Sequence, residues 1–492
     1  MNNSQLIGPV QDMVSKSDHI RYRGISIGQT LKVVFFSYLR TCVVYKDAPF
    51  KLSLYTIHWG ASVVKRIVTG VLWSSARMAG LRRLRSYRGK GIVVVSDHPG
   101  HVDQMMLDLI GRFQKEDVIL ITTSPHIYSR QKNRFPVSLN LYEPIHYWRW
   151  QHLPDYYRYY RKLCRSVGED RILFKLQFFA AVSSVIQAID YYRTFFDTVN
   201  VSAVVTLSDR HWHEYVIAMA ARKRDILTYT NQHGEFADLP LYTPFASDRA
   251  FVWGQKGREY LIQNGACSEQ VVVSGNPKFD RVYSWYLPRK KEIKAHMQQE
   301  YGLKPDRLTV TLLSSGMMPI ADVPQSRVFE IFKCFCQACE LKVNTLVKLH
   351  PHKDKDDREV YRIWLRKLGI SGDIPLLQSE DLFDVLTVTD IAVTFLSTTG
   401  LEAIGFGIPT ITLNIVDEVD LRDYLTFVED TIECRTPQGF YSILDEMVTE
   451  PARLQTQIER TRESRKRHFR NAEDFNTSEF VRDYIFAEVG LE

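Results

Sequence analysis

From residue 91 onward, short apolar runs alternate with amphipathic stretches along the chain. Runs rich in Val and Ile, bounded by polar residues or glycine, predict strands, and longer stretches with a period near 3.6 predict helices. A first series of predicted strands spans residues 91–96, 117–123, 201–207, 226–230, 250–253 and 271–274. A second series spans residues 308–313, 347–350, 391–395 and 410–413. Two series with a break between them predict an α/β protein with two Rossmann-like domains that face a cleft.

The break and the flanking segments set the predicted domain boundaries. Residues 288–306 are charged and helical in pattern, and they separate the two series. Before the first series and after the second, the pattern is helical. We therefore predict four parts, which are a helical segment at 1–90, a first domain at 91–290, a second domain at 300–436 and C-terminal helices at 437–492.

Residues 50–96 contain no Asp or Glu, and nine Lys and Arg residues fall within 51–90. Trp59 and Val63 belong to an apolar side of the same stretch. Two interpretations remain open, namely a basic amphipathic helix on an anionic membrane, or a helix that packs on a domain with solvated cations. No apolar run is expected to span a bilayer, because Lys65 and its neighbour interrupt the best candidate.

Composition narrows the class of protein. The chain has 492 residues, of which 45% are hydrophobic and 24% charged, as in soluble proteins of more than one domain. A net charge of +6 suits an anionic substrate or membrane surface but not nucleic acid, which needs a denser basic surface. The N-terminus lacks a signal-peptide pattern and the seven cysteines lack zinc-site spacing, so we expect a cytoplasmic protein, or one at the inner face of the membrane. No glycine-rich phosphate loop follows a predicted strand, which argues against ATP hydrolysis and dinucleotide redox chemistry.

Polar residues at three strand ends of the second series have the chemistry of a phosphate site. They are His350, Pro351, Ser397, Thr398, Thr399, Ser314, Ser315 and Gly316. The imidazole of His350 can donate to a phosphate oxygen, and the proline after it fixes the turn. The hydroxyl residues at 397–399 stand where a helix begins and so suit a phosphate, although they are also ordinary helix caps. Because carboxyl ends of parallel strands meet at one edge of a sheet, we expect these groups to form one site.

Three strand ends of the first series carry groups that can act as a general base. The candidates are Asp97, His101, Asp103, Asp209 and His233. The densest cluster, 97–103, has two carboxylates and two imidazoles in seven residues. A carboxylate or imidazole aimed at a hydroxyl group is what general-base catalysis requires. The same residues can also cap loops, and the sequence does not decide among them.

Five runs together carry a resemblance to a known group of proteins. They are Gln-His-Gly at 232–234, Phe-Val-Trp-Gly at 251–254, Val-Val-Val-Ser-Gly-Asn-Pro-Lys-Phe-Asp at 271–280, Lys-Leu-His-Pro at 348–351 and the block 397–409. Over about residues 200–415 the chain resembles bacterial surface-polysaccharide enzymes of the GT-B glycosyltransferase fold. This group includes CDP-glycerol glycerophosphotransferases and, more loosely, transferases that use CMP-activated sugars. The chain departs from the CDP-glycerol enzymes at 235–237, Glu-Phe-Ala in place of their Pro and Lys, which favours a sugar donor.

The resemblance implies roles for the two domains. In similar enzymes the histidine at the position of His350 contacts the donor phosphate, and an acid at the position of Glu402 binds the ribose. The second domain would then bind the nucleotide donor, and the first would hold the acceptor and the base. GT-B transferases generally stabilise the leaving phosphate with side chains and helix dipoles, so no metal or other cofactor is expected.

We therefore expect a glycosyltransferase that moves a sugar from a nucleotide donor, CMP- or CDP-linked, to a cell-surface polysaccharide or glycolipid, as in capsule or lipopolysaccharide synthesis. Three alternatives stay open. One is a CDP-glycerol or CDP-ribitol phosphotransferase of the teichoic-acid or capsule type. Another is a UDP-sugar 2-epimerase, although residues 233–237 lack its His-x-Glu-Ala-Gly run. The third is a non-catalytic protein that binds nucleotides or glycans.

Overall fold

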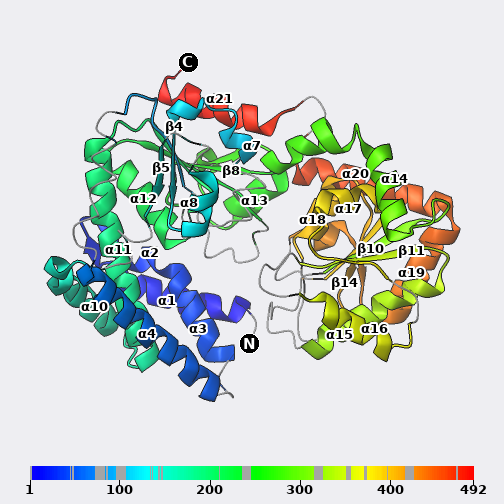
Figure 1. The fold of residues 1–492 in the computed structure, drawn as a ribbon, viewed down its shortest axis with the longest axis horizontal. Coiled ribbons are helices and arrows are strands. Elements are labelled where there is room, and N and C mark those ends of the chain that lie inside the picture. The colour runs from blue at the N-terminus through cyan, green and yellow to red at the C-terminus, as the bar shows by residue number, and fades with distance from the viewer. Residues whose placement is uncertain are drawn as a thin grey trace.

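The computed structural model describes most of the chain and shows two α/β units side by side (Figure 1). The described residues are 3–44, 46, 49–72, 84, 87–95, 107–132, 135, 137–141, 145, 148–209, 211–234, 236, 245–314, 325–350, 356–370, 374–395, 397–415, 421, 426–471 and 475–491. Each unit is built around one parallel sheet, and helices cover both faces of each sheet.

The N-terminal unit contains a seven-stranded parallel sheet with the order β5-β4-β3-β6-β7-β8-β9. Its strands are β3 (Ile92–Val95), β4 (Val118–Thr122), β5 (Val137–Asn140), β6 (Ala203–Thr206), β7 (Leu227–Asn231), β8 (Arg249–Val252) and β9 (Val271–Val273). The central strands β3, β4 and β6 are buried along their whole length. Continuous Val- and Ile-rich runs form such strands because both faces of a parallel sheet are covered.

Ten helices belong to this unit within the described ranges. They are α1 (Asn3–Ser17), α2 (Ile27–Thr30), α3 (Lys32–Val44), α4 (Pro49–Leu72), α7 (Leu107–Ile110), α8 (Pro125–Gln131), α10 (Leu153–Val167), α11 (Ile172–Thr198), α12 (Trp212–Arg222) and α13 (Gln255–Gln263). A short hairpin, β1 (Arg21–Tyr22) and β2 (Ile25–Ser26), precedes α2. The helices α1, α3, α4, α10 and α11 form a helical block below the sheet (Figure 1). Its core is aromatic, with Phe35 stacked on Phe178 at 5.0 Å between ring centroids.

The helix α11 corrects the expectation that no run could span a bilayer. By length and composition alone, this 27-residue helix would be sufficient, because its most apolar 18-residue stretch has a mean hydropathy of 1.7. However, 72% of its most apolar stretch is buried in the protein, where it packs against α4, α10 and α12. This burial is typical of the core helix of a folded unit.

The C-terminal unit contains a six-stranded parallel sheet with the order β12-β11-β10-β13-β14-β15. Its strands are β10 (Thr309–Leu313), β11 (Asn344–Lys348), β12 (Leu376–Leu377), β13 (Ile391–Thr394), β14 (Thr410–Leu413) and β15 (Ile432–Cys434). The helices are α14 (Lys290–Tyr301), α15 (Gln325–Cys336), α16 (Arg358–Lys367), α17 (Leu382–Val388), α18 (Thr399–Gly405), α19 (Pro437–Thr449) and α20 (Pro451–His468).

The last helix, α21 (Thr477–Val489), returns to the N-terminal unit and lies against its sheet (Figure 1). Tyr484 packs edge-on to Phe251 of β8 at 5.5 Å between ring centroids. Glu488 pairs with Arg249 of the same strand at 2.6 Å. The chain therefore crosses between the units twice, once before α14 and once after α20.

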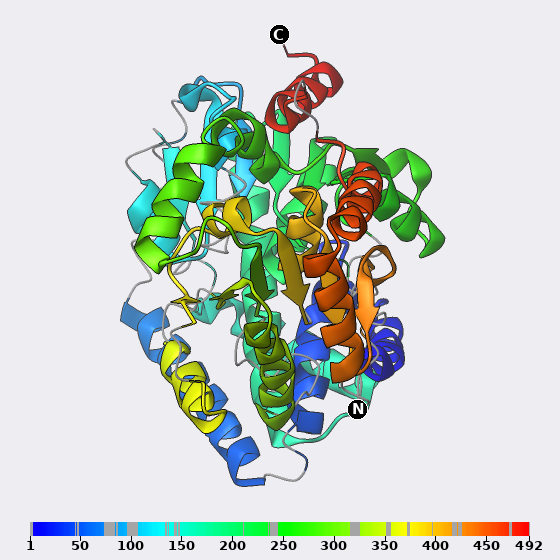
Figure 2. The same cartoon turned by 90° about the vertical axis from the view of Figure 1, so that its right-hand side faces the viewer.

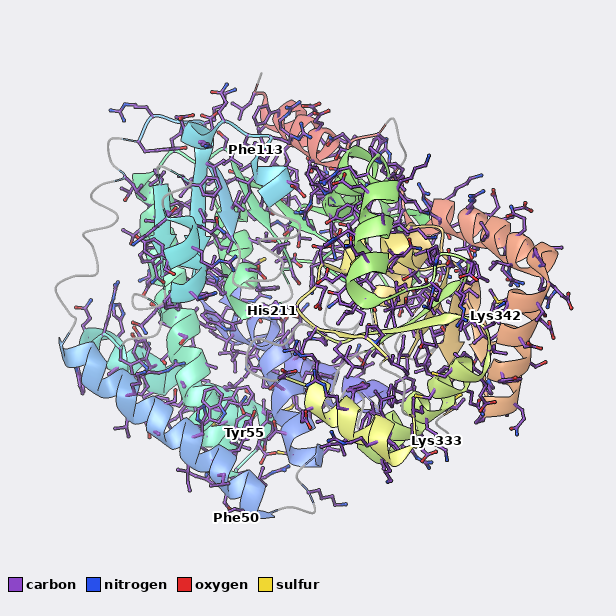
Figure 3. The ribbon with its side chains drawn as sticks, turned by 45° about the vertical axis from the view of Figure 1, so that its right-hand side comes forward. Phe50, Tyr55, Phe113, His211, Lys333 and Lys342 are labelled. Atoms are coloured by element: carbon purple, nitrogen blue, oxygen red, sulfur yellow. The ribbon has the colours of Figure 1, made fainter. Side chains whose placement is uncertain are left out.

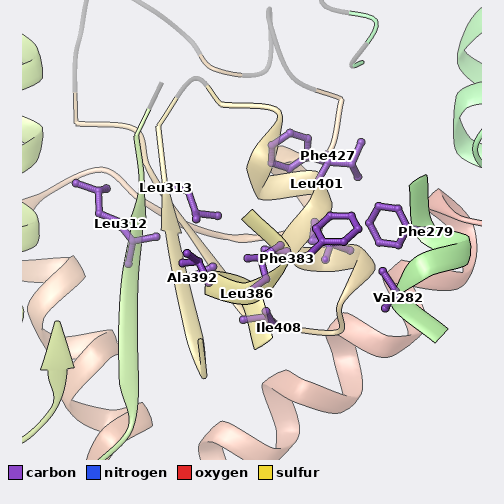
Figure 4. Packing of buried hydrophobic residues seen from close by; sticks show 14 of the residues in the cluster. Phe279, Val282, Leu312, Leu313, Phe383, Leu386, Ala392, Leu401, Ile408 and Phe427 are labelled. Carbon is purple, nitrogen blue, oxygen red and sulfur yellow. The ribbon is translucent and has the colours of Figure 1, made fainter. Parts of the chain in front are cut away.

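Aromatic residues pack where the two units meet (Figure 4). Phe279, in the short helix η7 (Pro277–Phe279) of the N-terminal unit, lies 5.4 Å from Phe383 of α17 between ring centroids. Phe279 also lies 6.0 Å from Phe406, just after α18. The core is therefore continuous from one unit to the other, and this continuity fixes the cleft between them.

The predicted fold class, two Rossmann-like units with helical segments at both ends, is confirmed. Each of the ten predicted strands corresponds to a strand of the structure. The sequence did not predict β5, β12 and β15. These three are short strands near the sheet edges, where less burial is needed and the apolar pattern is weak.

Candidate functional site

A cavity of about 330 Å³ lies between the two units at the carboxyl ends of their strands. The N-terminal unit contributes His233, Trp253, Asn276 and Lys278. The C-terminal unit contributes Ser314, Lys348, Leu349, His350, Ser379, Glu380, Asp381, Leu382, Ser397, Thr398, Thr399 and Glu402. This is where open parallel α/β sheets bind ligands, and the lining is rich in charged and hydroxyl groups.

Seven of the predicted site residues come together in this cavity. They are His233, Ser314, His350, Ser397, Thr398, Thr399 and Glu402. The topology explains the convergence, because β11, β10 and β13 are neighbours in the sheet and end at the same edge. Six other predicted residues lie outside the described part of the chain, namely Asp97, His101, Asp103, Ser315, Gly316 and Pro351.

The hydroxyl groups before α18 are organised by local hydrogen bonds. Ser397 Oγ lies 2.6 Å from Thr399 Oγ1. The backbone N–H groups of Gly400 and Leu401 donate to the carbonyl oxygens of Ser397 and Thr398. Because these N–H groups are used inside the turn, the hydroxyls rather than the helix end would contact a ligand here.

A buried ion pair joins the two units across the cavity. Lys278 Nζ lies 2.5 Å from Glu402 Oε1, and the two side chains are 11% and 12% exposed. Lys278 follows β9, whereas Glu402 stands in the first turn of α18. Lys278 Nζ also lies 4.7 Å above the ring of Phe383. Lys278 was not among the predicted site residues, although its position in the Gly-Asn-Pro-Lys-Phe-Asp run was a usable signal.

The residue before this turn, Asn276, adds a second group from the N-terminal unit. Its Oδ1 accepts a hydrogen bond from the backbone N–H of Lys278 at 3.1 Å. Its Nδ2 is buried without a hydrogen-bond partner among the residues that the structure describes, and the residue lines the cavity. A buried amide nitrogen without an acceptor is costly, so a ligand oxygen is a suitable partner for it.

Acidic residues from the loop between β12 and α17 line another wall of the cavity. Asp381 caps α17 and accepts a hydrogen bond from Tyr286 Oη at 3.1 Å. Glu380 Oε2 is buried and has no hydrogen-bond partner within the described part of the chain. The sequence analysis missed both acids because Ser-Glu-Asp before an apolar run is an ordinary helix start.

A lysine lies below these acids in the cavity floor. Lys348, the last residue of β11, donates from Nζ to the carbonyl oxygens of Leu349 at 3.1 Å and Gln378 at 3.0 Å. Burial lowers the pKa of Lys348, and the nearby carboxylates of Glu380 and Asp381 oppose this shift. The lysine therefore fixes the β11 and β12 strand ends relative to each other.

The loop that carries His233 is held in place by its neighbours. Gln232 Oε1 accepts from the backbone N–H of Trp253 at 2.9 Å, and the indole Nε1 of Trp253 donates to the Gln232 carbonyl at 3.0 Å. Gln232 Nε2 donates to the Gly234 carbonyl at 3.0 Å. These bonds place His233 on the N-terminal wall, facing the C-terminal unit across the cavity.

Asp209 does not join the other candidates in the cavity. Its carboxylate is buried and accepts a hydrogen bond from the backbone N–H of Ser247 at 2.8 Å. Burial raises the pKa of Asp209, while Lys32 opposes the shift. Of the competing base candidates, Asp209 is thus placed outside the cavity, where its carboxylate ties a strand end to the loop before β8. Within the described ranges, no group of three His, Cys, Asp or Glu side chains is arranged to hold a metal ion.

Comparison with solved structures gives the class of fold. A UDP-GlcNAc 2-epimerase from Neisseria meningitidis bound to UDP-GlcNAc matches with 13% identity and a TM-score of 0.52, over 80% of this chain and 99% of that one. MnaA of S. aureus, in a structure with UDP, matches with 16% identity and a TM-score of 0.52, over 82% and 98%. A glycosyltransferase from Rickettsia africae ESF-5 matches with 12% identity and a TM-score of 0.52, over 82% and 99%. The chain therefore has the two-unit GT-B fold. No protein-family model and no curated protein sequence matches it.

Proposed function

We propose that this protein is a glycosyltransferase that moves a sugar from a nucleotide donor to a cell-surface polysaccharide or glycolipid. The observation that carries the proposal is the cavity between the units, in which hydroxyl, imidazole, ammonium and carboxylate groups converge. Its C-terminal wall has the groups that a nucleotide diphosphate or monophosphate requires. Its N-terminal wall carries an imidazole for the acceptor side. The fold shared with nucleotide-sugar proteins is consistent with this assignment.

The donor phosphate would lie between His350 and the hydroxyls of residues 397–399. The strands before these groups, β11 and β13, flank β10 in the sheet, so both groups face the same space as Ser314. During transfer the bond between the sugar carbon and the phosphate oxygen breaks, and negative charge develops on the departing phosphate. Donors already aimed at this oxygen stabilise that charge, which is usually the largest single contribution to catalysis.

The ribose and the base would extend along α18 and α17. Glu402 can accept hydrogen bonds from ribose hydroxyls while Lys278 holds its other side. Glu380 Oε2 has no hydrogen-bond partner among the described residues and can accept a hydrogen bond from a base. The exocyclic amino group of cytosine can donate to it, which is compatible with a CMP- or CDP-linked donor. The ring N3–H of uracil can donate as well, so the turnover test decides the base.

The acceptor hydroxyl would approach from the N-terminal wall, where His233 is the described candidate for the base. It would take the hydroxyl proton as the acceptor oxygen forms its bond to the sugar carbon. Asp97, His101 and Asp103 stay candidates for the same role on sequence grounds. A glycerophosphate transfer from a CDP-alcohol would use the same phosphate groups, so it is the rival that a test must separate.

The test compares the turnover of a variant in the proposed phosphate site with that of a matched control variant. We expect His350→Ala to lower turnover of a CMP- or CDP-sugar about 100-fold, because a donor to the leaving phosphate is lost. The matched control is His296→Ala on α14, an exposed histidine that does not line the cavity, which should leave turnover unchanged. Normal turnover in His350→Ala would overturn the assignment. Turnover of a UDP-sugar without any acceptor would instead indicate an epimerase, and turnover of CDP-glycerol would indicate a phosphotransferase.

A further inference from the structure

The helix α4 has apolar side chains on two faces, and the protein covers only one of them. On the inner face, Trp59 and Val63 pack against the core of the helical block. Arg66 donates from Nη1 to the Ala180 carbonyl at 3.1 Å and to Ser184 Oγ at 2.7 Å, both on α11. These contacts fix the rotation of α4, so its outer face is permanently turned away from the protein.

The outer face carries a row of large apolar side chains, which we call the outer α4 stripe. Phe50 is 74% exposed, Leu54 51%, Ile57 66% and Val64 58%. Their spacing of four, three and seven residues places them along one side of the helix. Among the eleven large apolar side chains exposed in the described part of the chain, five lie on α4, these four and Tyr55. Such a concentration on one helix marks an interaction surface rather than scattered exposure.

The position of α4 leaves this stripe accessible. The helix lies at the outer edge of the molecule in both Figure 1 and the view turned by 90° in Figure 2. Figure 3 shows Phe50 at its outermost end and Tyr55 further along the same helix. From Phe50 to Val64 the stripe runs for about 21 Å. A helix fixed along its inner face can lie flat on a surface but cannot cross one.

The charges on α4 identify the surface that suits the stripe. The helix contains no Asp or Glu, and of its cations Arg66 is turned inward toward α11 whereas Lys65 is exposed. Lys65 follows Val64 of the stripe directly in sequence, and the polar ring of His58 is exposed after Ile57. An apolar row beside an exposed ammonium group, without acids, is complementary to the headgroups and acyl boundary of an anionic bilayer. A second copy of this face would offer no carboxylate to pair with Lys65, which disfavours self-association through it.

We propose that the outer α4 stripe docks the protein on anionic lipid bilayers. The docking is independent of the transfer reaction, because none of its residues lines the cavity. It combines the two interpretations that the sequence left open. Trp59 and Val63 pack on the protein, and the stripe on the other side of the same helix faces the lipid.

The experiment is co-sedimentation of the full chain with vesicles, which needs no knowledge of the substrate. We expect binding to vesicles of phosphatidylcholine with phosphatidylglycerol, weaker binding to phosphatidylcholine alone, and weakening at high ionic strength. The double variant Leu54→Asp/Ile57→Asp should lower the bound fraction on anionic vesicles about tenfold or more, because two apolar contacts are replaced by acids. Both side chains point outward, so the variant should keep the melting temperature of the wild type.

The matched control is Ile363→Asp on α16, a side chain that is 50% exposed in the C-terminal unit. It should bind vesicles like the wild type. The proposal fails if the wild type does not bind anionic vesicles, or if the control loses binding as strongly as the stripe variant. It also fails if the wild type forms a dimer in solution that the Leu54→Asp/Ile57→Asp variant abolishes, because the stripe would then be a contact between copies.

Discussion

The ion pair between Lys278 and Glu402 is the clearest single-residue contact between the two halves of the cavity. Both side chains are nearly buried, so each charge depends on the other for compensation. In the proposed donor site, Glu402 would receive the ribose while Lys278 keeps its carboxylate oriented. The pair therefore links the position of the N-terminal unit to the ligand site of the C-terminal unit.

We expect Lys278→Met to lower the free energy of unfolding by about 3 kcal/mol, because it leaves the carboxylate of Glu402 buried without a cation. The double variant Lys278→Met/Glu402→Leu should recover part of this loss, since no unpaired charge then remains. Urea unfolding of the two single variants and the double variant measures the coupling. Lys290→Met, an exposed lysine on α14, is the control and should change stability little. Additive effects of the two substitutions would contradict the coupling.

At this scale the sequence predicted part of the site and missed another part for a physical reason. His350, the hydroxyls at 397–399 and Glu402 stand on consecutive parts of one unit, where strand ends can be recognised locally. Lys278 and Asn276 enter the cavity from the other unit, and their role depends on how the units pack. Glu380 was not predicted, because the Ser-Glu-Asp run that contains it is an ordinary helix start.

Among the elements, α21 depends most on contacts that are distant in sequence. The carboxylate of Asp280 accepts hydrogen bonds from the backbone N–H groups of Thr477 at 2.8 Å and Ser478 at 2.9 Å. Ser478 Oγ adds a third bond at 2.7 Å. Gly275, with φ of +91°, lets the turn approach Thr477 closely. The Gly-Asn-Pro-Lys-Phe-Asp run thus holds the start of the last helix as well as lining the cavity.

We expect Asp280→Ala to release the start of α21 by removing an acceptor from two helix N–H groups, a loss of about 2 kcal/mol. Amide hydrogen exchange in residues 477–489 should become about tenfold faster or more. Asp306→Ala, an exposed aspartate before β10, serves as the control and should leave this exchange unchanged. Unaltered protection of α21 in Asp280→Ala would show that the aromatic contacts alone hold the helix.

This return could not be predicted from the sequence, because helix periodicity shows that a helix exists but not which sheet it covers. The long central strands could all be predicted from the sequence, since short continuous runs of Val and Ile are typical of strands that are buried on both faces. It missed α11 as a single helix, because a chain buried on most sides loses the polar stripe by which amphipathic helices are recognised.

At the scale of the whole molecule, a second cluster of charged residues joins the two units, and it is centred on Asp430. Asp430, in the short helix η11 (Val428–Asp430), accepts hydrogen bonds from Lys256 Nζ of α13 at 2.5 Å and His468 Nε2 of α20 at 2.9 Å. Arg467 and Ser464 also contact it. Burial alone would raise the pKa of Asp430, but the hydrogen bonds from His468 and Lys256 outweigh burial and hold its pKa well below the usual range.

This lowered pKa predicts a stability contribution with a defined pH range. Because the folded-state pKa lies below the unfolded value of about 3.9, the contribution is complete well above that pH and is lost as pH falls toward the folded-state pKa. We expect Asp430→Asn to be less stable than the wild type by about 3 kcal/mol at neutral pH, and the difference to narrow below about pH 4. Urea unfolding between neutral and acidic pH measures it, with Asp306→Asn as the control. A difference that is the same at every pH would rule out the carboxylate charge as its source.

The two chain crossings between the units lie next to each other. Asn276 donates from its backbone N–H to Asn471 Oδ1 at 2.8 Å, and Asn471 Nδ2 donates back to the Asn276 carbonyl at 3.1 Å. Tyr283 Oη donates to the Asn471 carbonyl at 3.3 Å. The segment that leaves the N-terminal unit is therefore hydrogen-bonded to the segment that returns to it, and both connections between the units are bonded to each other beside the cavity. The short turn that carries Asn276 and Lys278 is anchored by the returning chain as well as by its own unit.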